Sequence, residues 1–195
     1  MCIRDSPQES HRFGWIVEID PFNPTSMPKK RTALGRIKHE NAAFALSKDG
    51  RAVVYMGDDQ ADDYIYKFVS DGKYVKGGDN SRLLDSGKLY VARFGAGATP
   101  GDFAGTGEWL LLDKAADPKL QADSRFANQA AVLVYTRLAA DVVGATKMDR
   151  PEWVAVHPHT GEVYVTLTNN SGRKAADEAN PVSYTHLTLP TKRIV

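Results

Sequence analysis

Two segments of the sequence carry the same residue pattern, offset by 111 to 112 positions. Residues 39–59 read HENAAFALSKDGRAVVYMGDD, and residues 150–170 read RPEWVAVHPHTGEVYVTLTNN. Each segment has a glutamate near its start, followed by an apolar run, a glycine turn and a second apolar run containing tyrosine. Each closes on a pair of Asp or Asn residues. The pattern predicts two equivalent β-hairpins.

The spacing of these hairpins limits the fold. The blades of a β-propeller take about 40–55 residues each, so an offset of 111 residues matches two blades. A whole propeller has about 4–8 blades, whereas a chain of 195 residues has room for about three or four. We therefore expect an all-β fold, a partial β-propeller of about three to four blades.

The rest of the chain alternates between short β-rich runs and turn residues. Runs rich in β-branched and aromatic residues, bounded by Gly, Asp, Asn or Pro, are typical of strands. Residues 114–141 are rich in Ala and Leu and predict a short helical insertion. The glycine-rich residues 95–107 lack a phosphate-binding signature and predict a flexible connection. The predicted strands outside the repeat are residues 13–21, 63–69, 87–94 and 108–113.

Composition excludes several classes of partner and site. The chain has 25 basic and 24 acidic residues without a basic run, which does not favour a nucleic-acid partner. It has no apolar stretch long enough to span a membrane. Its single cysteine, Cys2, excludes an intrachain disulfide and a cysteine-based zinc site.

The repeat also predicts a group of oxygen ligands for a cation. The innermost strands of a propeller line one channel, so equivalent residues of different blades converge near its axis. Carboxylate and amide oxygens gathered in this way suit a hard cation such as calcium, which takes six to eight oxygen ligands. The alternative is that these Asp and Asn residues only cap tight turns and bind no metal. The predicted metal ligands are Glu40, Glu152, Asp58, Asp59, Asn169 and Asn170.

Other polar residues near these positions are expected to have structural roles. Asp62 and Asp63 fit the turn between two strands. His39 precedes Glu40 and, on a strand, would point to the opposite face. His157 and His159 fall in the turn of the second hairpin, where we expect them to be exposed.

An arginine adjoins one of the predicted ligands in the sequence MDRPEW. Pro151 restricts Arg150 to extended backbone, which would project Arg150 and Glu152 to the same side. A guanidinium beside a metal-binding carboxylate suits phosphate, which arginine can bind with two hydrogen bonds. The alternative is an ordinary surface ion pair, which contributes at most about 1 kcal/mol. The match of Glu152 to Glu40 favours the phosphate site.

Several motifs in order resemble one known family. The segments GWIVEIDP, KRTALGRIKHE, VVYMGDD, YIYKFVS, GKLYVARF, EWLLL, GATKMDRPEW and GEVYVTLTNN together resemble the PhoX alkaline phosphatases, over residues 12–172. The resemblance implies a six-bladed propeller, periplasmic or extracellular, that hydrolyses small-molecule phosphomonoesters at a centre of Ca²⁺ and Fe³⁺. It implies Arg150 as the phosphate-binding residue and Glu40, Asp59 and Glu152 as metal ligands. Asp58, Asn169 and Asn170 are weaker candidates.

The resemblance also implies that the chain is the central part of a longer protein, a monomer when full length. Residues 1–7 and 183–195 share no pattern with the sequence between them and are interpreted as non-native ends, and residues 8–182 belong to the propeller. The resemblance implies that the iron is also held by an upstream cysteine, whose context Cys2 does not match, and that further ligands come from downstream. We therefore expect the chain alone to be inactive. The alternatives are another calcium-dependent propeller hydrolase, such as a lactonase or a phytase-like enzyme, and a non-catalytic propeller scaffold.

Overall fold

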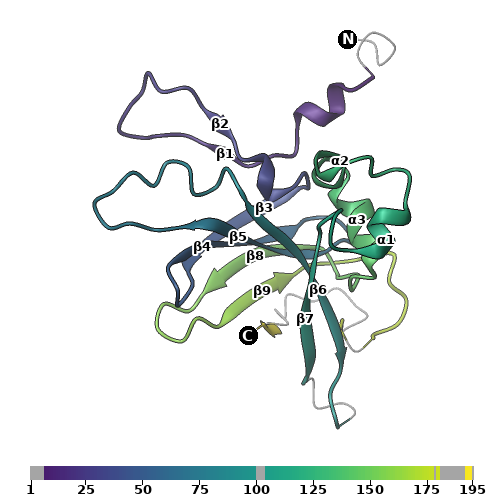
Figure 1. The fold of residues 1–195 in the computed structure, drawn as a ribbon. Coiled ribbons are helices and arrows are strands. Elements are labelled where there is room, and N and C mark those ends of the chain that lie inside the picture. The colour runs from purple at the N-terminus through teal and green to yellow at the C-terminus, as the bar shows by residue number, and fades with distance from the viewer. Residues whose placement is uncertain (1–6, 100–103, 178, 181–191, 195) are drawn as a thin grey trace.

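The computed structural model describes residues 7–99, 104–177, 179–180 and 192–194. Most of the regular structure is β, and it forms three sheets joined by short helices (Figure 1). The predicted ends, residues 1–7 and 183–195, lie largely outside the described residues, and their assignment stays a prediction. None of the helices in the described part of the chain has the length and apolar character needed to cross a membrane.

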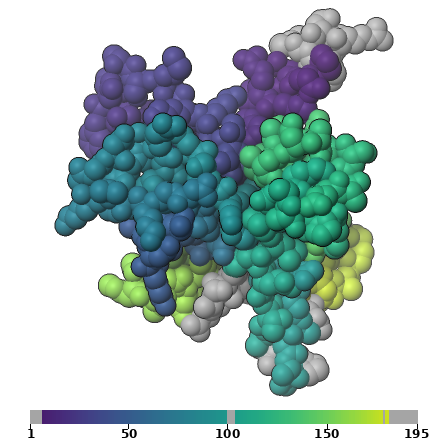
Figure 2. Space-filling model, viewed as in Figure 1, coloured from purple at the N-terminus to yellow at the C-terminus, as the bar shows by residue number. Residues whose placement is uncertain are grey.

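The largest sheet is an antiparallel meander of five strands in chain order. Its first two strands are the hairpin of residues 39–59, and each later strand pairs with the one before it. The β6–β7 hairpin projects away from the body of the molecule (Figure 2). The strands are β3 (His39–Leu46), β4 (Arg51–Asp58), β5 (Ile65–Lys73), β6 (Gly87–Ala96) and β7 (Gly105–Leu111).

The second repeat hairpin forms a separate sheet. Strands β8 (Pro151–Val156) and β9 (Val163–Leu167) pair antiparallel, and β10 (Lys192–Ile194) adds to β9. A small third sheet pairs β1 (Val17–Glu18) with β2 (Lys29–Lys30).

Short helices fill the connection between β7 and β8. They are α1 (Pro118–Ala122), α2 (Gln129–Val134) and α3 (Thr136–Val143), and two 3₁₀ turns lie earlier in the chain, at Glu9–Arg12 and Thr32–Leu34. Asp117 and Asn128 cap α1 and α2 by accepting hydrogen bonds from backbone N–H groups of the first turn. The predicted helical insertion is confirmed, as three short helices.

The five-stranded sheet has an apolar core on each face. On one face it packs against the helices and the 3₁₀ turn at Thr32–Leu34, with Tyr64, Phe68 and Phe126 among the largest buried side chains. On the other face it packs against β8 and β9 through a smaller core containing Met148, Val154, Val163, Val165 and Leu167. This second core brings the two repeat hairpins into contact.

The two repeat hairpins share details beyond their strands. Each turn has a glycine with positive φ, +86° at Gly50 and +74° at Gly161, which suits a residue without Cβ. The first strand of each hairpin has a shift in its pairing register with the second strand. In β3 the shift lies between His39 and Asn41, where Glu40 has no partner in the register, and in β8 it lies between Pro151 and Val154. Both shifts are β-bulges that include the glutamate near the start of the repeat, and bulges often re-aim a side chain beside an active site.

Other predictions are only partly met. The strand predicted for residues 13–21 is found only at Val17–Glu18, and the rest of that prediction is wrong. Ile19 and Phe22, which follow, are exposed and belong to no sheet. The expected connection over residues 95–107 is shorter, since β6 runs to Ala96 and β7 starts at Gly105; residues 100–103 lie outside the described residues. The fold is mostly β, and no closed sheet occurs in the described part of the chain. The blade count stays a prediction.

Candidate functional site

A glycine lets the end of β4 approach the start of β8 closely. A Cβ atom on Gly57 would lie 2.4 Å from the carbonyl oxygen of Glu152 and 2.7 Å from that of Pro151. Nearby, the Asn41 Oδ1 atom of β3 accepts a hydrogen bond of 3.2 Å from the Val154 N–H. The chain therefore needs glycine at position 57, and the residues that follow it are brought beside β8.

The side chains of Asp59, Arg150 and Glu152 meet at this junction. Arg150 donates from Nε to Asp59 Oδ1 at 2.9 Å and from Nη2 to Oδ2 at 3.0 Å. Its Nη2 also lies 3.6 Å from Glu152 Oε1, which accepts a 2.5 Å hydrogen bond from Thr168. The Asp59 and Glu152 side chains are 22% and 26% exposed. Two carboxylates thus share one guanidinium, and the group carries a net negative charge.

The backbone of Arg150 differs from the sequence prediction. Its φ is +35°, in the left-handed region, so the extended backbone expected before Pro151 is wrong. Such a conformation costs about 1–3 kcal/mol for a residue other than glycine and persists only where surrounding contacts hold it. The Arg150 carbonyl accepts a 3.2 Å hydrogen bond from the Thr168 N–H, which is one such contact. The Arg150 and Glu152 side chains approach each other all the same.

Asp58 points away from this group, into the protein. Its side chain is fully buried and accepts from Nε of Arg137 at 2.6 Å and from Nη2 of the same guanidinium. Its Oδ1 also accepts a 3.2 Å hydrogen bond from the Lys38 N–H. Arg137 belongs to α3, so this ion pair joins the helical insertion to the end of β4.

Asp62 and Asp63 do more than close a turn. Asp62 has a φ of +63°, as expected in a turn, and its side chain accepts from Asn170 at 3.0 Å. Asp63 is 6% exposed and lies 3.5 Å from Arg137. Burial, followed by the negative charge of Asp58, raises the pKa of Asp63 to about 7.

The remaining predicted ligands lie at different levels of exposure. Glu40 is exposed at the bulge of β3, and Asn169 is exposed after β9. Asn170 is buried, and its amide oxygen accepts a 3.0 Å hydrogen bond from the Gly172 N–H. The structure thus brings Asp59, Arg150 and Glu152 into one contact group, and it records no contact of Glu40 with them.

The histidines behave as expected. His157 and His159 are exposed in the turn between β8 and β9. The His39 Nε2 atom lies 3.0 Å from the Gly35 carbonyl oxygen, and burial lowers its pKa. A neutral ring bonded to the backbone is a structural role.

The residues fit a metal centre only in part. Asp59 and Glu152 supply the oxygen donors that calcium and ferric iron prefer. Within the described ranges, no group of three or more His, Cys, Asp and Glu side chains is arranged to hold a metal ion. A complete coordination sphere would therefore need ligands beyond those that the described residues bring together.

Three residues of this region were not identified from the sequence: Thr168, Arg137 and Arg173. Thr168 directly precedes the Asn pair that closes the second repeat, and nothing else in the sequence indicates that it belongs to the site. Arg137 and Arg173 lie in segments without a recognisable motif. Their ion pairs, with Asp58 and Asp149 respectively, join residues more than 20 positions apart in the sequence.

Comparison with known proteins agrees with the resemblance found in the sequence. No curated protein matches the chain. A solved structure described as Pseudomonas fluorescens PhoX in complex with vanadate, a transition state analogue, matches with a TM-score of 0.78 and 52% sequence identity. The match covers 93% of this chain and 31% of that one, so the chain spans about a third of its length. The model of the family "Alkaline phosphatase PhoX" matches residues 3–187. The chain belongs to the PhoX alkaline phosphatase family.

Proposed function

We propose that this chain is the central segment of a metal-dependent alkaline phosphatase that hydrolyses small-molecule phosphomonoesters. The observation that carries the proposal is the contact group of Asp59, Arg150 and Glu152, formed where the two repeat hairpins meet. Membership of the PhoX family supports the reaction class, and the related structure binds vanadate, a transition state analogue.

Arg150 is the proposed phosphate-binding residue. Its side chain is 38% exposed, so it can reach a ligand, and the planar fork of its guanidinium matches two oxygens of a phosphoryl group. Asp59 and Glu152 aim the guanidinium in the absence of substrate. A positive group held in place where negative charge builds on the phosphoryl oxygens stabilises the transition state.

Glu40, Asp59 and Glu152 are the proposed metal ligands, with Ca²⁺ and Fe³⁺ as the metals. Bound there, the cations would add positive charge beside the phosphoryl group. Asn169 and Asn170 have weaker support. Asp58 has the least, because both of its carboxylate oxygens accept hydrogen bonds from Arg137.

The whole protein, here called the full-length parent, is proposed to be a six-bladed propeller that acts as a monomer in the periplasm or outside the cell. The upstream cysteine and the downstream ligands of the centre would come from the rest of that parent. The 195-residue chain by itself is therefore expected to be inactive.

The test is hydrolysis of p-nitrophenyl phosphate by the full-length parent, with and without a chelator, beside its Glu152→Gln variant. Glu108→Gln is the matched control, because Glu108 pairs with Arg93 at the β6–β7 hairpin, outside the proposed centre. We expect activity that a chelator abolishes, a loss of at least about 100-fold in Glu152→Gln, and little change in Glu108→Gln. An inactive, folded parent loaded with calcium and iron would refute the proposal.

A further inference from the structure

Two residues other than glycine have positive φ in the part of the chain that the structure describes. They are Asp62, at +63°, and Arg150, at +35°. Residues with a Cβ rarely adopt this region, and they remain in it only where neighbouring contacts hold them. Asp62 lies between β4 and β5, whereas Arg150 precedes β8, and one side chain contacts both segments.

Arg173 connects the two positions. Its side chain, only 14% exposed, donates from Nη2 to Asp62 Oδ1 at 3.3 Å. From Nε it donates to the carboxylate of Asp149, the residue directly before Arg150. A third contact, from Nη1 to Asp177, fixes the remaining arm of the guanidinium.

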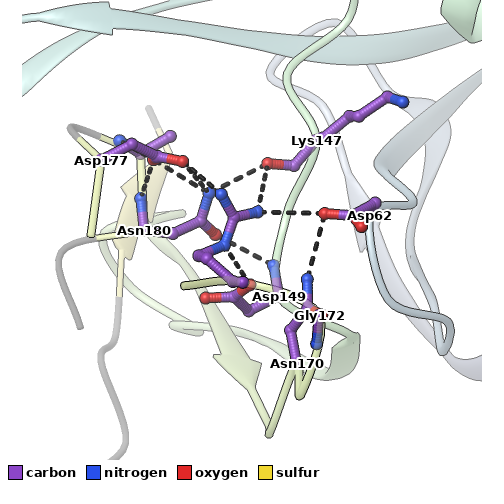
Figure 3. A network of polar contacts seen from close by, with 9 residues as sticks. Asp62, Lys147, Asp149, Asn170, Gly172, Asp177 and Asn180 are labelled. Atoms are coloured by element: carbon purple, nitrogen blue, oxygen red, sulfur yellow. Dashed lines mark hydrogen bonds and ion pairs between the residues drawn. The ribbon is translucent and has the colours of Figure 1, made fainter. Parts of the chain in front are cut away.

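Asn180 and Asn170 complete this network. Asn180 is 1% exposed, accepts the Asp149 N–H at 2.9 Å and donates to the Lys147 carbonyl at 2.9 Å. Asn170 donates to Asp62 at 3.0 Å (Figure 3). Asp149 is therefore held at both its side chain and its N–H group.

We propose that Arg173 is a positioning residue for Arg150, an inference that rests on the proposed function. By fixing Asp149 on one side and Asp62 on the other, Arg173 holds the turn that leads into β8. That turn sets the direction in which the Arg150 side chain leaves the backbone toward Asp59 and Glu152. Arg173 has no contact with these two carboxylates and acts only through the backbone of Arg150.

The geometry explains why this position needs arginine. Three carboxylates, of Asp62, Asp149 and Asp177, accept from three different nitrogens of one rigid, planar group. A lysine ammonium is a single point charge on a flexible stem and cannot hold three partners at fixed angles. Arg173→Lys therefore keeps the charge and removes the geometry.

The experiment measures KM, kcat and the inhibition constant of inorganic phosphate for the full-length parent and its Arg173→Lys variant. Arg51→Lys is the matched control, because Arg51 likewise pairs with a carboxylate, Asp49, and donates to two carbonyls. It lies at the end of β4 opposite to Asp58. A third variant, Arg150→Lys, and the double variant Arg150→Lys/Arg173→Lys complete a double-mutant cycle.

We expect Arg173→Lys to lower kcat/KM by about 10–100-fold and to raise KM and the phosphate inhibition constant together, with kcat changed less. Arg51→Lys should leave KM, kcat and the phosphate inhibition constant within about two-fold of the values of the unsubstituted enzyme. In the Arg150→Lys background the effect of Arg173→Lys should disappear, because coupled residues are not additive. Additive effects, or unchanged KM and phosphate inhibition in Arg173→Lys, would overturn the inference. An inactive parent enzyme would instead refute the proposed function, and the inference with it.

Discussion

Asp63 gives the structure a pH dependence that one substitution should remove. Its pKa is raised from 3.8 to about 7 in the folded chain, chiefly by burial. A carboxyl group with a raised folded pKa stabilises the fold fully below pH 3.8, and this contribution is lost as the pH rises through 7. The difference between the two pKa values corresponds to about 4 kcal/mol.

Asp63→Asn replaces the carboxyl group by a neutral amide of the same shape. Relative to the unsubstituted chain, the free energy of unfolding of the variant should therefore increase between pH 4 and pH 8, by up to about 4 kcal/mol. The contact with Arg137 at 3.5 Å is already included in this figure, because the Arg137 charge lowers the pKa of Asp63 and burial outweighs it.

The assay is urea unfolding of both proteins at pH 4, 5, 6, 7 and 8, followed by circular dichroism. Asp123→Asn is the control, since hydrogen bonds from Arg125 lower the pKa of Asp123 from 3.8 to about 2, so its contribution to stability is already in place above pH 4. The difference in free energy of unfolding between that variant and the unsubstituted chain should therefore stay nearly constant from pH 4 to pH 8. A difference between Asp63→Asn and the unsubstituted chain that stays flat from pH 4 to pH 8 would refute the reasoning.

Two further predictions test the junction between the hairpins. Gly57→Ala should lower the free energy of unfolding by about 1–3 kcal/mol, because its Cβ would meet the Glu152 carbonyl oxygen at 2.4 Å. Gly50→Ala, in a turn with open space around it, tests the left-handed conformation alone, and an unchanged free energy of unfolding in Gly57→Ala would contradict the close approach. Asn41→Ala should lower the free energy of unfolding by about 1–3 kcal/mol, because the Val154 N–H loses its acceptor. Thermal unfolding measures this loss, and an unchanged melting temperature would contradict it.

The sequence predicted the two repeat hairpins because their signals are local. Alternation, a glycine turn and the Asp or Asn residues that follow each hairpin all lie within about 20 positions. Their equivalence extended to the bulges at Glu40 and Glu152, which nothing in a single strand would indicate. The approach of Arg150 to Glu152 was also expected, but from an extended backbone at Arg150 that the structure does not have.

The parts of the site that the sequence did not predict depend on contacts distant along the chain. Arg137 reaches Asp58 across 79 positions, and no pattern in the helical insertion marks it. The backbone of Arg150 follows the contacts of Asp149 and Thr168 rather than the local preference imposed by Pro151. Local rules describe an isolated segment, whereas packing against other segments overrides them in the folded chain.

The most direct test of the central claim is a crystal structure of the full-length parent with vanadate bound. The account predicts that the Arg150 guanidinium donates to vanadate oxygens and that Glu152 is a ligand of an adjacent metal ion. A structure with vanadate bound elsewhere, and with Arg150 still held only by Asp59 and Glu152, would contradict it.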